Sequence, residues 1–170
     1  MPLPLHPTMR TSMILRFPDV SRVTRNNTTV AGFAIESETN LGHGTCFPHV
    51  DDFFNRYRAA FPERDITQDV FYGITRYTGV STFEYWMTFT HAPDQRIPAE
   101  MTTMNLDGGV FAACTVPGIG QTVLSWQAIE SQWLLGHEYT YDYQRLPYER
   151  YDERYFQTRM FELYIPILSS

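Results

Sequence analysis

The sequence is poor in cysteine and in long apolar runs. Its only cysteines, Cys46 and Cys114, lie far apart and form no CxxC pair, so we interpret them as reduced core residues rather than as a disulfide or a metal site. No run of about eighteen apolar residues is present to form a transmembrane helix, and the start has no signal-peptide core. We therefore expect a cytoplasmic protein without a membrane partner.

Basic residues and catalytic motifs are also scarce. The chain carries 13 Lys and Arg against 19 Asp and Glu, so it does not predict the phosphate-neutralising surface of a nucleic-acid-binding protein. GxSxG, Walker-type and Gly-rich dinucleotide motifs are absent, and we expect no cofactor. His43 and His49 are the closest pair of histidines, but their spacing across an expected loop fits no metal site, so we expect no metal.

Aromatic side chains, by contrast, are abundant. The chain has 12 Phe, 11 Tyr and 3 Trp, which make up 15% of its 170 residues. Tyrosine combines an apolar ring with a polar hydroxyl, which suits the wall of a binding pocket. We expect a disordered leader over residues 1–12, where prolines oppose regular pairing, followed by a single domain over residues 13–170.

Apolar periodicity predicts the same order of elements in both halves of the chain. In the first half we expect a strand pair, an amphipathic helix and two more strands, at 20–24, 28–36, 48–61, 69–77 and 82–90. In the second half we expect the same series, at 101–106, 109–116, 122–135, 139–151 and 159–168. Thr122 is the expected N-cap of the second helix.

Short sequence matches accompany this repeated order. Phe83-Glu84-Tyr85 recurs as Phe161-Glu162-Leu163. Internal repetition of this kind predicts a duplicated unit, here over about residues 20–92 and 99–168. The fold class we expect is therefore α+β, with two βαββ repeats that form an antiparallel sheet.

Motifs in the second half resemble the GyrI-like effector-binding domains, which occur alone and as the ligand-binding part of AraC-type and MerR-type regulators. The resemblance rests on a helix that carries Trp126 and ends in Trp133-Leu134, on the run Tyr148-Glu149-Arg150-Tyr151, and on a closing strand that ends in Ile165-Pro166-Ile167. Gly109-Val110-Phe111-Ala112 also fits the pattern, whereas Gly136-His137 after the helix departs from it. The resemblance covers about residues 20–168.

The resemblance implies SHS2-like repeats with a ligand groove between the two helices, where aromatic rings hold a flat lipophilic cation and a glutamate supplies the counter-charge. Glu149 matches that glutamate. Tyr151 shares its strand face, and Tyr164 and Glu162 in the last strand are further candidates. The remaining candidate ligand-binding residues are aromatic: Tyr72, Tyr85, Trp86, Phe111, Trp126 and Trp133. Tyr85 and Trp86 are adjacent, so only one of them can face the pocket.

Purely structural roles remain open for several of these residues. Glu149 could instead pair at the surface with Arg145, Arg150 or Arg154, and the two tryptophans on the second helix could simply pack it against the sheet. We expect a small-molecule-binding module for lipophilic cations, which would sense or sequester drugs and could act as a monomer.

Two alternative functions follow from the same resemblance. One is a hydrolase of strained electrophilic toxins, in which Glu149 would act with Tyr164 or Tyr151 on a water molecule. The other is a protein that acts by contacting a partner such as DNA gyrase.

Overall fold

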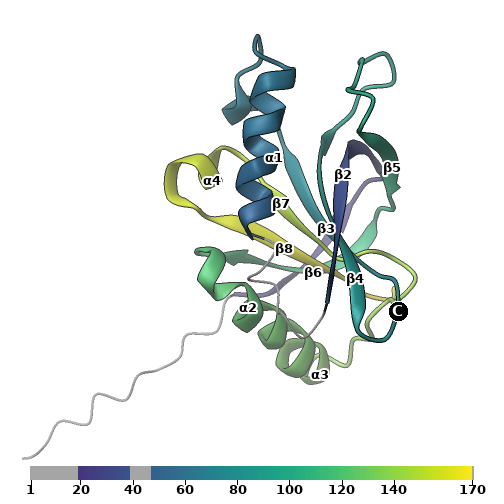
Figure 1. Ribbon diagram of the computed structural model, residues 1–170. Coiled ribbons are helices and arrows are strands. Elements are labelled where there is room, and N and C mark those ends of the chain that lie inside the picture. Colours follow the sequence, from purple (N-terminus) through teal and green to yellow (C-terminus); the bar gives the residue numbers. More distant parts are fainter. Residues whose placement is uncertain (1–18, 39–46, 170) are drawn as a thin grey trace, which may run out of the picture.

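An eight-stranded antiparallel sheet organises the chain, as the computed structural model shows (Figure 1). The structure describes residues 19–38 and 47–169; the expected leader, Cys46 and His43 lie outside these ranges. The strands are β1 Ser21–Arg25, β2 Thr28–Glu38, β3 Phe71–Tyr77, β4 Thr82–Thr90, β5 Thr102–Leu106, β6 Gly109–Val116, β7 Tyr148–Tyr151 and β8 Phe161–Pro166. The helices are α1 Phe47–Ala60, α2 Thr122–Ala128, α3 Leu134–Gly136 and α4 Glu153–Thr158. The α+β class with an antiparallel sheet is confirmed.

The order of the strands is symmetric about the centre of the sheet. It runs β1-β6-β8-β7-β3-β4-β2-β5, so β7 and β3 pair in the middle, and each half contributes two strands, a long helix and two more strands. The edge strands are exchanged, because β1 pairs with β6 and β5 pairs with β2. The repeated glutamates occupy similar positions: Glu84 pairs with Arg76, and Glu162 pairs with Arg150. The two halves therefore meet along one central strand pair.

The first long helix follows the expected pattern. Its apolar positions at i, i+3, i+4 and i+7 are all at most 3% exposed and belong to the core: Val50, Phe53, Phe54 and Tyr57. The helix ends at Ala60, two residues before Pro62, which cannot continue the hydrogen-bonding pattern. This helix was expected at 48–61, and its boundaries agree to within one residue.

The second long helix is less regular than expected. Five residues, Ile129–Trp133, form a π-helical segment between α2 and α3. Thr122 is not the N-cap: its hydroxyl donates to the carbonyl of Ile119, and Gln121 occupies the cap position without a side-chain bond. The π segment widens the helix between Trp126 and Trp133 and changes the regular helical spacing between them.

The strand expected at 139–151 is wrong over most of its length. Only β7 is a strand there, and Tyr141 forms an isolated bridge with Ile167. The rest is a turn that the side chain of Arg145 holds through hydrogen bonds to backbone carbonyls, so those residues do not pair as a strand. The chain also contains a short helix that was not expected, α4, which the carboxylate of Asp152 caps by accepting from the backbone of Arg154.

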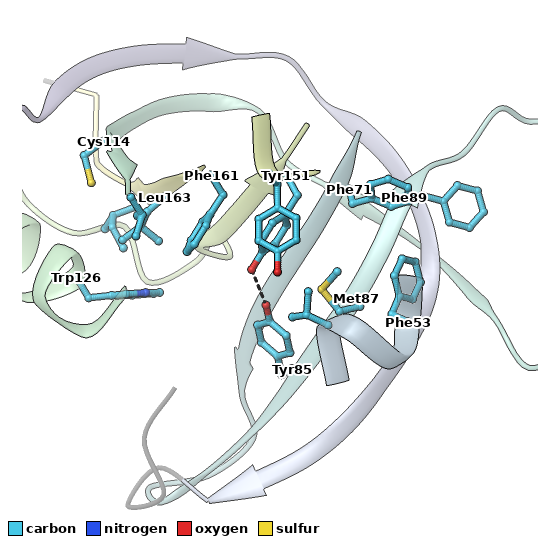
Figure 2. Close-up of a cluster of buried hydrophobic side chains, with 14 of the residues drawn as sticks. Phe53, Phe71, Tyr85, Met87, Phe89, Cys114, Trp126, Tyr151, Phe161 and Leu163 are labelled. Carbon is cyan, nitrogen blue, oxygen red and sulfur yellow. Dashed lines mark hydrogen bonds between the residues drawn. The ribbon is translucent and has the colours of Figure 1, made fainter. Parts of the chain in front are cut away.

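The two faces of the sheet carry different cores. The larger core contains side chains from α1, α2 and α4, and Figure 2 shows part of it. We call this the helix face. The smaller core, on the opposite face, contains strand residues only: Val30, Tyr72, Ile74, Leu106, Phe111, Ala113, Tyr148 and Tyr164. Among the helices of the described ranges, none is both long and apolar enough to cross a bilayer.

Candidate functional site

A buried carboxylate lies in the middle of the sheet, on the helix face. Glu149 of β7 is opposite Gly73 of β3 and is only 4% exposed. The hydroxyl of Tyr85 donates a hydrogen bond of 2.5 Å to Oε2 of Glu149, and the hydroxyl of Tyr151 donates one of 2.7 Å to the same oxygen. The two hydroxyl oxygens are 3.3 Å apart (Figure 2). We call Glu149, Tyr85 and Tyr151 the carboxylate site.

Strand alternation explains how these three side chains meet. Glu149 and Tyr151 are two residues apart in β7, so both project to the helix face. Tyr85 projects to the same face from β4, two strands away. Of the adjacent pair Tyr85 and Trp86, it is therefore Tyr85 that reaches the carboxylate, while the indole of Trp86 donates to Glu84 on the opposite face.

Gly73 leaves the space in which the carboxylate site forms. A Cβ at this position would lie 2.2 Å from the hydroxyl oxygen of Tyr85 and 2.7 Å from Oε2 of Glu149. Because β3 lies between β4 and β7, any side chain here would separate Tyr85 from Glu149. The sequence shows Gly73 within a strand, but nothing in it indicates which side chains need that space.

Burial dominates the electrostatics of the carboxylate site. It raises the pKa of Glu149 above the ordinary value, while the hydrogen bonds from Tyr85 and Tyr151 act in the opposite direction. Burial, followed by the nearby Glu149 carboxylate, raises the pKa of Tyr151 well above its ordinary value. Tyr151 therefore stays a neutral hydroxyl that donates to the carboxylate.

The alternative in which Glu149 pairs with a surface arginine is wrong. Arg145 binds Asp142 and backbone carbonyls, whereas Arg150 and Arg154 bind Asp152 and Glu162. Within the described ranges, Glu149 has no basic partner. Glu149 is a buried carboxylate that accepts hydrogen bonds from two neutral hydroxyls. Burial of a charge without an opposite charge beside it lowers the stability of a folded protein.

We predict that Glu149→Gln stabilises the ligand-free protein at neutral pH by roughly 1 kcal/mol, because the amide keeps the acceptor oxygen and removes the buried charge. A carboxyl whose folded pKa is raised contributes stability below its unfolded pKa and loses it as pH rises through the folded value. The extra stability of Glu149→Gln over the wild type should therefore vanish near pH 4, as urea unfolding of both proteins at pH 7 and at pH 4 would reveal.

Glu162→Gln is the matched control on the opposite face. Glu162 accepts from Arg150 and Arg154, so its neutralisation should lower stability at neutral pH. A loss of stability in Glu149→Gln similar to that in Glu162→Gln would contradict the prediction.

His49 adjoins the carboxylate site and was considered from the sequence only as a metal ligand. Its ring meets the Tyr85 ring edge-on at 6.4 Å and the Phe33 ring at 5.2 Å. Burial lowers its pKa, against a smaller opposite effect of Asp52, so the ring is neutral at pH 7. His49 lies four residues before Phe53 on the buried stripe of α1, and this spacing could have indicated that it faces inward.

The two candidate tryptophans of the second long helix lie on the helix face. Trp126 is 6% exposed and belongs to the same cluster as Phe161 and Leu163 (Figure 2). Trp133 is half-buried and stacks on His137 and Tyr139 at ring distances of 4.6 and 5.2 Å. Packing of the helix against the sheet accounts for Trp126; a role of either residue in ligand binding stays a prediction.

Five other expected site residues lie on the face opposite Glu149. Phe111, Tyr72 and Tyr164 belong to the smaller core, Trp86 packs against it, and Glu162 is bound by the Tyr164 hydroxyl at 2.8 Å and by Arg150. Because Glu149 is opposite Leu163 in β8, the neighbouring Glu162 and Tyr164 must project the other way. The structure does not bring these five residues to the carboxylate site.

The carboxylate site can perform two kinds of chemistry. A carboxylate between two phenol rings can hold a cation through charge and ring faces, and it can also accept a proton from water. Tyr164 lies on the opposite face of the sheet and cannot assist in accepting a proton from water. Tyr151 and Tyr85 contact the carboxylate and could assist. A surface cavity of about 460 Å³ between α1 and α4 is lined by other residues, among them Asp51, Arg58 and Arg159.

Comparison with known proteins agrees with this architecture. Residues 23–167 match the Cass2 family, described as integron-associated effector binding protein. No curated protein matches the sequence. An integron cassette protein from the mobile metagenome of Vibrio cholerae has a similar structure, with a TM-score of 0.60 and 13% identity, over 88% of this chain and 95% of that one.

Two further solved structures share the fold. SAV2435 bound to tetraphenylphosphonium has a TM-score of 0.59 and 10% identity, over 89% of this chain and 94% of that one. The C-terminal domain of EcmrR has a TM-score of 0.59 and 10% identity, over 90% of this chain and 99% of that one. Because the family match extends over most of the sequence, the chain belongs to the family of integron-associated effector binding proteins and is a small-molecule-binding module.

Proposed function

We propose that the chain binds a lipophilic, aromatic cation at the carboxylate site, and that it senses or sequesters such compounds. The observation that carries the proposal is Glu149, a buried carboxylate with two tyrosine donors and, among the described residues, no basic partner. A cation would supply the missing charge, and the rings of Tyr85 and Tyr151 would add cation–π contacts of about 0.5–2 kcal/mol each. SAV2435, which shares the fold, was solved with tetraphenylphosphonium.

Binding requires the carboxylate site to open. With Glu149 only 4% exposed and Tyr151 fully buried, a ligand must displace at least one of the side chains that cover them. Displacement of Tyr85 would be sufficient, because its hydroxyl contacts both Glu149 and Tyr151 and a rotation of its side chain would break both contacts. The ligand would thus replace an internal hydrogen bond with an ion pair.

Tetraphenylphosphonium titration by calorimetry tests the proposal. We expect the wild-type protein to bind, and Glu149→Gln to bind at least tenfold more weakly, a loss of about 1.4 kcal/mol, because the attraction between the carboxylate and the phosphonium charge is removed. Glu162→Gln is the control, since Glu162 lies on the opposite face and should leave the affinity unchanged. Equal affinity of wild type and Glu149→Gln would exclude the carboxylate site as the cation site.

Acidification should weaken tetraphenylphosphonium binding, because the phosphonium charge is permanent and only the protein titrates. The pKa of Glu149 is raised by burial, so protonation begins at a higher pH than for an exposed carboxyl. His49, whose pKa is lowered by burial, becomes positive at lower pH beside Tyr85, with Asp52 and Arg56 as its charged neighbours on α1. We expect affinity to fall steadily from pH 7 to pH 5; a constant affinity over that range would contradict it.

A further inference from the structure

Both hydrogen bonds that Glu149 accepts from the described residues reach the same oxygen. Tyr85 and Tyr151 both donate to Oε2, and among the described residues no hydrogen bond reaches Oε1. A carboxylate has about four acceptor sites, so Oε1 can accept donors from a ligand, in a side chain that is only 4% exposed. Such an oxygen is best satisfied by a donor that carries positive charge.

A second acceptor without a donor lies on His49. The backbone of Phe33 raises the pKa of the ring as a hydrogen-bond acceptor would, while Nε2 is buried and has no partner within the described ranges. We therefore assign the ring proton to Nδ1. A neutral imidazole with its proton on Nδ1 has a lone pair on Nε2, so this atom is an acceptor; the tautomer is assigned from these bonds.

Both acceptors adjoin the same tyrosine. The His49 ring approaches the Tyr85 ring edge-on at 6.4 Å, and the Tyr85 hydroxyl contacts Glu149. A ligand that displaced the Tyr85 ring would therefore meet an anionic oxygen from β7 and a neutral nitrogen from α1. Among the described residues, no donor bonds to Nε2 of His49, and the two tyrosine donors to Glu149 both reach its other oxygen.

We propose that the carboxylate site selects cations that carry N–H donors, such as ammonium, amidinium or guanidinium groups on an aromatic body, over quaternary onium cations of the same size. The N–H groups would donate to Oε1 of Glu149 and to Nε2 of His49. This inference rests on the proposed cation binding and adds the chemical class of the ligand. A quaternary cation gains the charge attraction but donates a hydrogen bond to neither acceptor.

A matched pair of probes tests this selection. Biphenyl-4-ylmethylammonium and biphenyl-4-ylmethyl-trimethylammonium have the same aromatic body and the same charge at pH 7.5, and only the first has N–H donors. We expect wild type to bind the primary ammonium at least about tenfold more tightly, as a charged hydrogen bond would give. Equal affinity, or a preference for the trimethylammonium, would overturn the inference.

Three histidine variants separate recognition from packing. In His49→Phe the preference should shrink at least threefold while trimethylammonium affinity stays within twofold, because the ring is kept and the acceptor is lost. His49→Gln, which retains an acceptor, should restore part of the preference, and His91→Gln, beyond the end of β4, should leave it unchanged. A parallel loss of affinity for both probes in His49→Phe would reduce His49 to a packing residue and overturn its part in selection.

Glu149→Gln distinguishes failure of this inference from failure of the proposed function. If both probes bind wild type and both lose affinity in Glu149→Gln, cation binding stands, and the ratio of the two affinities alone decides the selection. If neither probe nor tetraphenylphosphonium binds, the proposed function fails and the inference fails with it.

Discussion

Replacement of Arg145 by alanine should lower the free energy of unfolding by about 3–5 kcal/mol, the usual cost of breaking a buried, fully bonded ion pair. The Arg145 side chain is 13% exposed and its Nε binds Asp142 at 2.7 Å. Its other nitrogens donate to three backbone carbonyls, those of Gly108, Val110 and Ile167, at 2.6–3.0 Å. One side chain thus donates hydrogen bonds to backbone carbonyls both at the start of β6 and just after β8.

Arg145→Lys should recover little of this loss. A lysine ammonium is a single point charge and cannot reproduce a planar guanidinium that donates in several fixed directions. Gly109, between two of the carbonyls, has a φ of 124°, and a Cβ there would lie 2.4 Å from Nη1 of Arg145, so the backbone is shaped around the guanidinium. Urea unfolding of the wild type, Arg145→Ala and Arg145→Lys measures both losses of stability.

Arg76→Ala is the matched control for Arg145→Ala. Arg76 also pairs with a carboxylate, Glu84, but its side chain is 47% exposed, and exposed pairs contribute only about 0–1 kcal/mol. Similar losses in the two variants would show that Arg145 acts as a surface charge only. The hydrogen bond from Arg145 holds the pKa of Asp142 below its ordinary value. The stability that the Arg145–Asp142 pair contributes should therefore be lost as pH falls through that lowered value.

The elements that periodicity predicts correctly are those whose own side chains determine their burial. The stripe of Val50, Phe53 and Tyr57 defines α1, and β4 lies at 82–90 as expected. The strand predicted at 139–151 was wrong, because the conformation of this segment depends on hydrogen bonds from Arg145 to the carbonyls of Val110 and Ile167. Sequence periodicity does not indicate such distant partners. The helix α4 had a usable indication in Asp152 followed by Glu153.

The candidate site was predicted in part. Alternation within one strand correctly placed Glu149 beside Tyr151 and showed that Tyr85 and Trp86 must diverge. It could not relate the face of β7 to the face of β8, because the register that sets Glu149 opposite Leu163 is a property of the folded sheet. Tyr164 and Glu162 therefore lie on the face opposite Glu149, where Glu162 accepts a hydrogen bond from Arg150.

Gly73→Ala should lower stability by about 1–3 kcal/mol, the usual cost of overpacking a filled core. The added methyl would lie 2.2 Å from the Tyr85 hydroxyl, which must then leave Glu149. Gly120→Ala is the control, since nothing lies within 4 Å of a Cβ there, and it should change stability by less than about 0.5 kcal/mol.

Tyr85→Phe tests whether the cost at Gly73 arises from the carboxylate site. Removal of the hydroxyl relieves the shortest contact of the new methyl group, although the contacts with Oε2 of Glu149 at 2.7 Å and with the Tyr85 ring carbon at 2.9 Å remain. The double variant should therefore lose about 1 kcal/mol less than the sum of the two single variants in urea unfolding. Strict additivity would mean that Gly73 is needed for the strand backbone alone. Coupling would instead identify a glycine that leaves space for a hydroxyl to reach a buried charge, and so links the middle of the sheet to the proposed function.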